Sequence, residues 1–199
     1  KHAVITFGRV GTSVGGFWGA FRDLGGKGSE VRDVYRERKS GIRRWEVVEF
    51  LSFQGRTDLV QQVIDAGPEV ISHNRETVRR LSDSVRSRAT YEVSLKVIGQ
   101  IAASQCVAKS GIMLGLGETR EEILETMDDL RNVGCQVMTI GQYLQPTHKH
   151  YPVAEYVTPA QFTAYKELGL KKGFTQVESA PLVRSSYHAE KSTQYLQKR

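Results

Sequence analysis

Residues 108–140 read AKSGIMLGLGETREEILETMDDLRNVGCQVMTI and contain one complete strand–helix–strand unit. The apolar runs 108–114 and 137–140 predict two buried strands. Between them, Thr119 and Glu122 form the S/T-x-x-E capping box that begins a helix, and Gly134 ends that helix. Two buried strands joined by one helix are typical of a parallel βαβ unit.

The same alternation extends to both sides of this unit. Further helices are predicted over 57–66, after the N-cap residue Thr90, and after a second capping box at 158–161. Further strands are predicted at 3–6, 45–50, 70–72 and 175–178. The order predicts an α/β fold of about five parallel strands with helices outside. An incomplete barrel and an open, doubly wound sheet both fit this pattern.

Composition limits the class of protein. The chain has 199 residues, of which 39% are hydrophobic and 25% charged, as expected for one globular domain. No apolar run is long enough to span a membrane, the first residues contain no secretory leader, and no nucleic-acid module is present. We therefore expect a cytoplasmic protein that binds neither membrane nor nucleic acid. The net charge of +6 indicates a solvated surface or a patch for an acidic partner.

The two cysteines, Cys106 and Cys135, stand just before predicted strands. Chemistry in parallel α/β proteins gathers at the opposite, carboxyl ends of the strands. We therefore predict that both are inert structural thiols. Their number and spacing exclude a disulfide framework and a CxxC pair within this sequence.

Polar residues follow three of the predicted strands, at 72–77, 115–118 and 141–146. These segments are expected to converge at one rim of the sheet, where Asn74, Glu76, Glu118 and Gln142 could bind a polar ligand. Each residue alone has a structural alternative: Asn74 could cap a helix, and Glu118 could be an acid favoured by the helix dipole.

Four motifs carry a resemblance to a known family. They read GIMLGLGE (111–118), TIGQYLQPT (139–147), EYVTPAQF (155–162) and PLVRSSYHAE (181–190). In this order they resemble lipoyl synthase, a radical S-adenosylmethionine enzyme. Residues 53–81 fit the same family, so the resemblance runs from about Phe53 to Lys191.

The resemblance implies a partial (β/α) TIM-like barrel of the radical S-adenosylmethionine type, without its first strand and cluster loop. It implies sulfur insertion at C6 and C8 of a protein-bound octanoyl chain, with S-adenosylmethionine and two 4Fe–4S clusters, one of them sacrificed as sulfur source. The partners implied are an octanoylated lipoyl-carrier domain or glycine-cleavage H protein and a reducing electron donor. The rim residues would bind the cofactor, and Ser186, the second serine of RSSY, would ligate the sacrificial cluster.

The sequence departs from the family in two ways. It contains neither the C-x-x-x-C-x-x-C motif nor the C-x4-C-x5-C motif that hold the clusters. Residues 7–50 diverge from the family, and we hypothesise that they are translated out of frame. The expected organisation is a partial barrel over 1–190, divergent at 7–50, and a tail over 191–199.

Three interpretations follow from these departures. The chain is an inactive fragment or degenerate copy, a subunit of a split enzyme, or a cofactor-free module that binds acidic lipoyl-carrier domains. In the third interpretation the docking residues are five arginines, Arg75, Arg79, Arg80, Arg86 and Arg88.

Overall fold

The computed structural model describes residues 47–49, 53–65, 67–85 and 90–184. Their strands form one sheet in the order β1-β2-β3-β4-β5, and every neighbouring pair is parallel. The strands are β1 (Val47–Glu49), β2 (Val70–Ser72), β3 (Val107–Leu114), β4 (Val137–Gln142) and β5 (Gln176–Ser179). The predicted strand at 3–6, Ser186, and most of the divergent stretch 7–50 lie outside the described residues.

The helices alternate with these strands along the chain. They are the 3-10 turn η1 (Phe53–Gly55), α1 (Thr57–Asp65), α2 (Ser82–Val85), α3 (Tyr91–Ala102), α4 (Arg120–Asn132) and α5 (Pro159–Lys171). The short η1 and α2 were not predicted, because elements of three or four residues have no hydrophobic period.

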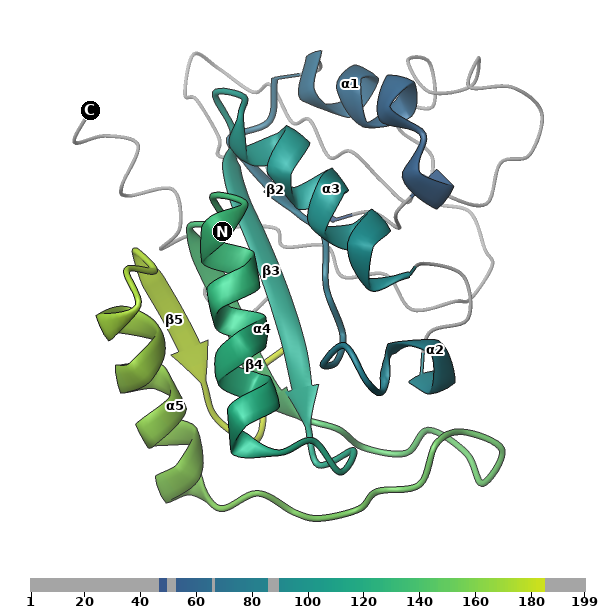
Figure 1. The fold of residues 1–199 in the computed structure, drawn as a ribbon, viewed down its shortest axis with the longest axis vertical. Helices are drawn as coiled ribbons and strands as arrows, with labels where there is room; N and C mark the ends of the chain where they lie inside the picture. The colour runs from purple at the N-terminus through teal and green to yellow at the C-terminus, as the bar shows by residue number, and fades with distance from the viewer. Residues whose placement is uncertain (1–46, 50–52, 66, 86–89, 185–199) are drawn as a thin grey trace, which may run out of the picture.

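The strand order decides between the two architectures that the sequence left open. Strands that follow one another in space as in sequence, joined by right-handed crossovers, place all their helices on one face of the sheet. Figure 1 shows α3, α4 and α5 side by side over the same face. A doubly wound sheet would reverse its strand order and carry helices on both faces. The fold is therefore α/β with the singly wound sheet of a partial barrel, as predicted.

The two faces of the sheet bury different residues. The main core packs between the helices and one face, and from the strands it includes Ile71, Ala108, Ile112, Met138 and Ile140. Successive side chains of a strand point to opposite faces. The preceding residues Val70, Val107 and Val137 therefore lie on the other face, where they form a separate buried cluster. None of the helices in the described ranges covers this face, and we call it the helix-free face.

The predicted helix starts are confirmed. The Thr90 hydroxyl accepts from the Val93 N–H. Both capping boxes, Thr119 with Glu122 and Thr158 with Gln161, make their two reciprocal hydrogen bonds. Because these side chains satisfy N–H groups that the first helical turn leaves without partners, they fix where the chain leaves the carboxyl edge of the sheet.

Candidate functional site at the carboxyl edge

Asn74 belongs to a polar cluster on the helix-free face. A side chain at Gly111 would overlap with Thr139 Oγ1 and come within 3.2 Å of Asn74 Oδ1. The Ser72 hydroxyl lies 3.5 Å from the same Asn74 oxygen. Thr139 alternates with Met138 and Ile140, which face the helices, so its side chain lies on the other face. Because Gly111 has no side chain, an amide and two hydroxyl groups pack closely around it and form this polar cluster.

The chain continues beside β3 after β2 has ended, and this continuation positions Asn74 and Glu76. The His73 N–H donates to the Lys109 carbonyl, and the Glu76 carbonyl accepts from the Met113 N–H. Glu76 has a φ of 70°, in the left-handed region that side-chain-bearing residues seldom adopt. Such conformations persist where the surrounding structure holds them, often at functional sites.

Glu118 closes the loop after β3. Its carboxylate accepts from the Gly115 N–H at 2.6 Å and from the Leu116 N–H at 2.9 Å. Gly115 and Gly117 have φ values of 99° and 95°, which a residue with a side chain would adopt only with strain. Glu118 also lines a cavity of about 260 Å³ together with residues of α4 and α5. This cavity is on the helix side of the sheet.

Gln142, the last residue of β4, holds two other segments in place. Its amide nitrogen donates to the Glu155 carbonyl at 3.1 Å, and its amide oxygen accepts from the Val157 N–H at 3.0 Å. Its backbone N–H donates to the Pro181 carbonyl at 3.2 Å. Gln142 therefore joins the β4–α5 loop and the segment after β5 to the end of β4.

The four rim residues predicted from sequence thus lie at the carboxyl edge but in two groups. Asn74 belongs to the polar cluster on the helix-free face, and Glu76 follows it beside β3. Glu118 and Gln142 direct their polar atoms to backbone groups of the surrounding loops. Ser72 was part of the predicted polar segment 72–77 but was not proposed as a site residue. Thr139 was missed, because a short polar residue inside a buried strand has no distinguishing pattern.

The two cysteines lie at the other end of the sheet. Both are free and buried, with 3% of Cys106 and none of Cys135 exposed. Burial raises the pKa of the Cys106 thiol and raises that of Cys135 to about 12. This confirms their prediction as structural thiols. Since iron–sulfur clusters are held by thiolates, neither thiol fits a cluster ligand. Within the described ranges, no group of three His, Cys, Asp or Glu side chains could hold a metal ion.

The structure removes Arg75 from the predicted arginine docking surface. Arg75 is fully buried, with its guanidinium 3.9 Å from the centre of the Tyr91 ring. Arg79 stacks on the same ring at 4.1 Å and pairs with Asp129 at 3.1 Å. Tyr91 donates to the same carboxylate at 2.9 Å. These residues tie the chain after β2 to α3 and α4, and Arg75 cannot meet a partner protein.

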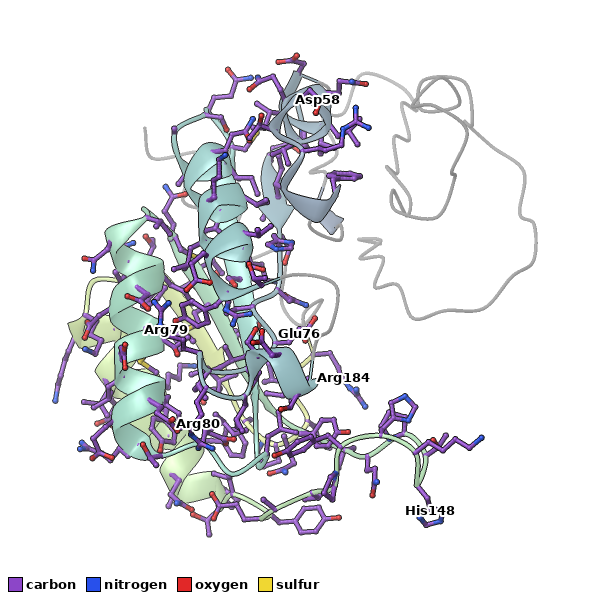
Figure 2. All side chains as sticks on the ribbon, turned by 45° about the vertical axis from the view of Figure 1, so that its right-hand side comes forward. Asp58, Glu76, Arg79, Arg80, His148 and Arg184 are labelled. Atoms are coloured by element: carbon purple, nitrogen blue, oxygen red, sulfur yellow. The ribbon has the colours of Figure 1, made fainter. Side chains whose placement is uncertain are left out.

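Arg80 also has partners within the chain. It pairs with Glu122 at 2.6 Å and donates to the Gly117 carbonyl at 2.8 Å. Figure 2 shows Arg79 and Arg80 lying against α4. Arg86 and Arg88 lie outside the described residues. No helix in the part of the chain that the structure describes is long and apolar enough to cross a membrane.

Comparison with known proteins supplies the family. No protein-family model matches the chain. A lipoyl synthase of Bacteroides fragilis is 69% identical over 143 residues, which are 72% of this chain and 50% of that protein. A lipoyl synthase of Treponema denticola is 70% identical over 139 residues, 70% of this chain and 48% of that protein.

A third lipoyl synthase, from Porphyromonas gingivalis, is 62% identical over 140 residues, 70% of this chain and 50% of that protein. The chain spans about half the length of the curated relatives it matches. The matches agree with the parallel α/β sheet and with the family that the four sequence motifs resemble. The chain belongs to the lipoyl synthase family.

Proposed function

We propose that this chain forms part of the wall of a lipoyl synthase barrel and acts in sulfur insertion at C6 and C8 of a protein-bound octanoyl chain. The observation that carries the proposal is the polar cluster of Ser72, Asn74 and Thr139 around Gly111. The cluster lies on the helix-free face, which corresponds to the inner face of a barrel, and near the edge where barrel enzymes place their active sites.

The rim residues have two roles in this proposal. Asn74 and Glu76 contact S-adenosylmethionine, because an amide and a carboxylate suit its amino, hydroxyl and adenine groups. Glu118 and Gln142 support cofactor binding through the loops whose backbone groups they hold. Preorganised loops lower the entropic cost of binding a ligand.

The residues at hand do not fit the two 4Fe–4S clusters. The sequence contains two cysteines, and both are buried at the edge away from the polar cluster. We therefore propose that the cysteine ligands of the clusters come from residues outside these 199, in the same polypeptide or in a partner chain. Ser186 is the one cluster ligand that this sequence would supply. Alone, the chain is then inactive. The reaction requires a reductant and a compartment that keeps thiolates reduced, such as the cytoplasm.

A complementation experiment tests the proposal. The chain is mixed under anaerobic conditions with a polypeptide that carries both cysteine motifs, S-adenosylmethionine, an electron donor, and an octanoylated lipoyl-carrier domain or H protein. We expect 5′-deoxyadenosine and lipoyl product from the mixture and none from either polypeptide alone. Failure of the mixture to form either product would contradict the proposal.

The same assay tests the role of Asn74 in the polar cluster. Replacing Asn74 by alanine removes a polar contact that we expect to raise the KM for S-adenosylmethionine roughly tenfold. Asn132→Ala, on the exposed surface of α4, is the matched control and leaves KM unchanged. Equal KM values for the two variants would exclude Asn74 from the cofactor site.

A further inference from the structure

Large apolar side chains are exposed mainly at the carboxyl edge. In the described part of the chain, four of them are exposed: Leu144 at 47%, Tyr156 at 73%, Leu182 at 81% and Leu170 at 45%. Leu144 follows β4, Tyr156 precedes α5, and Leu182 follows β5. Leu170 stands alone near the far end of α5, at the opposite edge of the sheet.

Hydrogen bonds of Gln142 bring the first three together, although they are far apart in sequence. Its backbone N–H binds the Pro181 carbonyl, next to Leu182. Its side-chain amide binds Glu155 and Val157, the two neighbours of Tyr156. Leu144 is two residues beyond Gln142. The three side chains therefore belong to two segments, the β4–α5 loop and the segment after β5, that Gln142 joins by hydrogen bonds.

Cationic groups flank this junction. The β4–α5 loop has an ordered tip, where the Gln145 amide donates to the His150 carbonyl at 2.8 Å and the Thr147 hydroxyl lies 2.9 Å from His150 Nδ1. This turn exposes His148 and Lys149.

The segment after β5 adds a second cation to the junction. Arg184 is exposed, and Figure 2 shows it and His148 projecting on the side away from α4. The β4–α5 loop also contains one exposed acidic residue, Glu155, which directly precedes Tyr156. The β4–α5 loop and the segment 180–184 thus expose Lys149, Arg184 and two histidines, and one carboxylate, Glu155.

We propose that a patch at this edge docks the acidic folded domain whose acyl-lysine is the substrate. The patch, which we call the carboxyl-edge patch, consists of Leu144, Tyr156, Leu182, Lys149 and Arg184. This inference rests on the proposed function. The candidate site opens at this edge, so an acyl-lysine arm that enters it leaves the body of its domain against the rim. Exposed apolar residues beside cations suit an interface with an acidic protein. The ordered turn at 145–150 lowers the entropic cost of association.

Binding of the full chain to an octanoylated lipoyl-carrier domain tests the patch by titration calorimetry. Leu144→Ser, Tyr156→Ser and Leu182→Ser are each expected to weaken binding about tenfold, because each removes apolar area from the contact. Leu170→Ser, at a similarly exposed leucine on the opposite edge, leaves the affinity unchanged.

Charge reversal provides a second comparison in the same titration. Arg184→Glu weakens binding more at low salt than at high salt, because exposed charges are screened by ions. Lys96→Glu, at an exposed position of α3, has no such effect. Equal affinities for the patch variants and their controls, or no binding by the unaltered chain, would overturn the docking proposal. The latter result would also follow if the chain's own residues or a second copy covered the patch.

A short octanoyl-lysyl peptide separates this inference from the proposed function. In the complemented mixture, the patch variants lose turnover of the octanoylated domain and keep turnover of the peptide. Normal turnover of both substrates by every variant would reject the patch and leave the proposed function standing. Absence of turnover with both substrates in the unaltered mixture would reject the proposed function, whereas the titration still decides the patch.

Discussion

The backbone carbonyl of Val183 packs directly against the α-carbon of Gly141, where any side chain would overlap with it. Gly141 alternates with Ile140 and so faces the helix-free side of β4. The chain after β5 therefore turns back across the end of β4 toward that side. Two further hydrogen bonds hold the turn, from the Gln142 N–H to the Pro181 carbonyl and from the Ala180 N–H to the Ile140 carbonyl.

Gly141→Ala is expected to displace this turn. Overpacking against backbone costs about 1–3 kcal/mol of unfolding free energy. Amide hydrogen exchange at Gln142 and Ala180 would quicken, because both N–H groups bind across the turn. The matched control is Gly99→Ala in α3, where a new methyl group meets Val133 Cβ at an ordinary 3.6 Å. The free energy of unfolding of the Gly99→Ala variant is expected to rise by about 0.5–1 kcal/mol. Equal changes in the free energy of unfolding at both glycines would contradict the tight contact at Gly141.

Ser186, the proposed cluster ligand, stands two positions after Arg184, just beyond the segment that forms this turn. In the complemented mixture, Ser186→Ala is expected to lose lipoyl product and retain 5′-deoxyadenosine formation, since a serine oxygen is a harder ligand for iron than a thiolate. Ser185→Ala is the matched control. Iron release during turnover, followed with a chelator, gives a second readout, and unchanged sulfur insertion by the Ser186 variant would rule the role out.

The ionisation of Tyr91 makes the free energy of unfolding depend on pH in the alkaline range. Burial is the main cause that raises its pKa from 10.0 to about 12. Between these values the unfolded chain releases a proton that the native chain retains, so the unfolding free energy falls as pH rises through this window. The contribution is fully present below pH 10. Tyr91→Phe removes this pH-dependent loss and, because the bond to Asp129 disappears, lowers the neutral-pH stability by about 1 kcal/mol.

Urea unfolding across this pH window measures the difference between the chain and its Tyr91→Phe variant. Tyr156→Phe is the control, because Tyr156 is 73% exposed. If the free energy of unfolding falls equally steeply with pH in the Tyr91→Phe variant, Tyr91 is not the source of the pH dependence.

Local patterns account for most of the fold that could be predicted. Thr119 with Glu122 and Thr158 with Gln161 make hydrogen bonds within four residues, so their sequence spacing suffices to place the helix starts. The choice between barrel and doubly wound sheet depended on strand order, which no local pattern specifies. The segment after β2 also continues beside β3 for longer than the short apolar stretch of β2 indicated. Its polar residues bind β3 through their backbone groups.

The site was harder to predict for the same reason. Gln142 was recognised as a rim residue, but its partners Glu155 and Val157 are more than ten positions away in the chain. Arg75 was expected on the surface because arginine is seldom buried. Its burial depends on Tyr91, whose ring carries both Arg75 and Arg79, and sequence spacing alone does not reveal that stack.

We propose that this chain is part of a lipoyl synthase barrel and that its own two thiols hold no cluster. Both thiols are buried at the edge opposite the candidate site, and burial raises both pKa values. The most direct measurement is iron content after anaerobic reconstitution of the isolated chain, with assay of 5′-deoxyadenosine. We expect no stoichiometric iron and no product. A stable 4Fe–4S cluster that cleaves S-adenosylmethionine would contradict it.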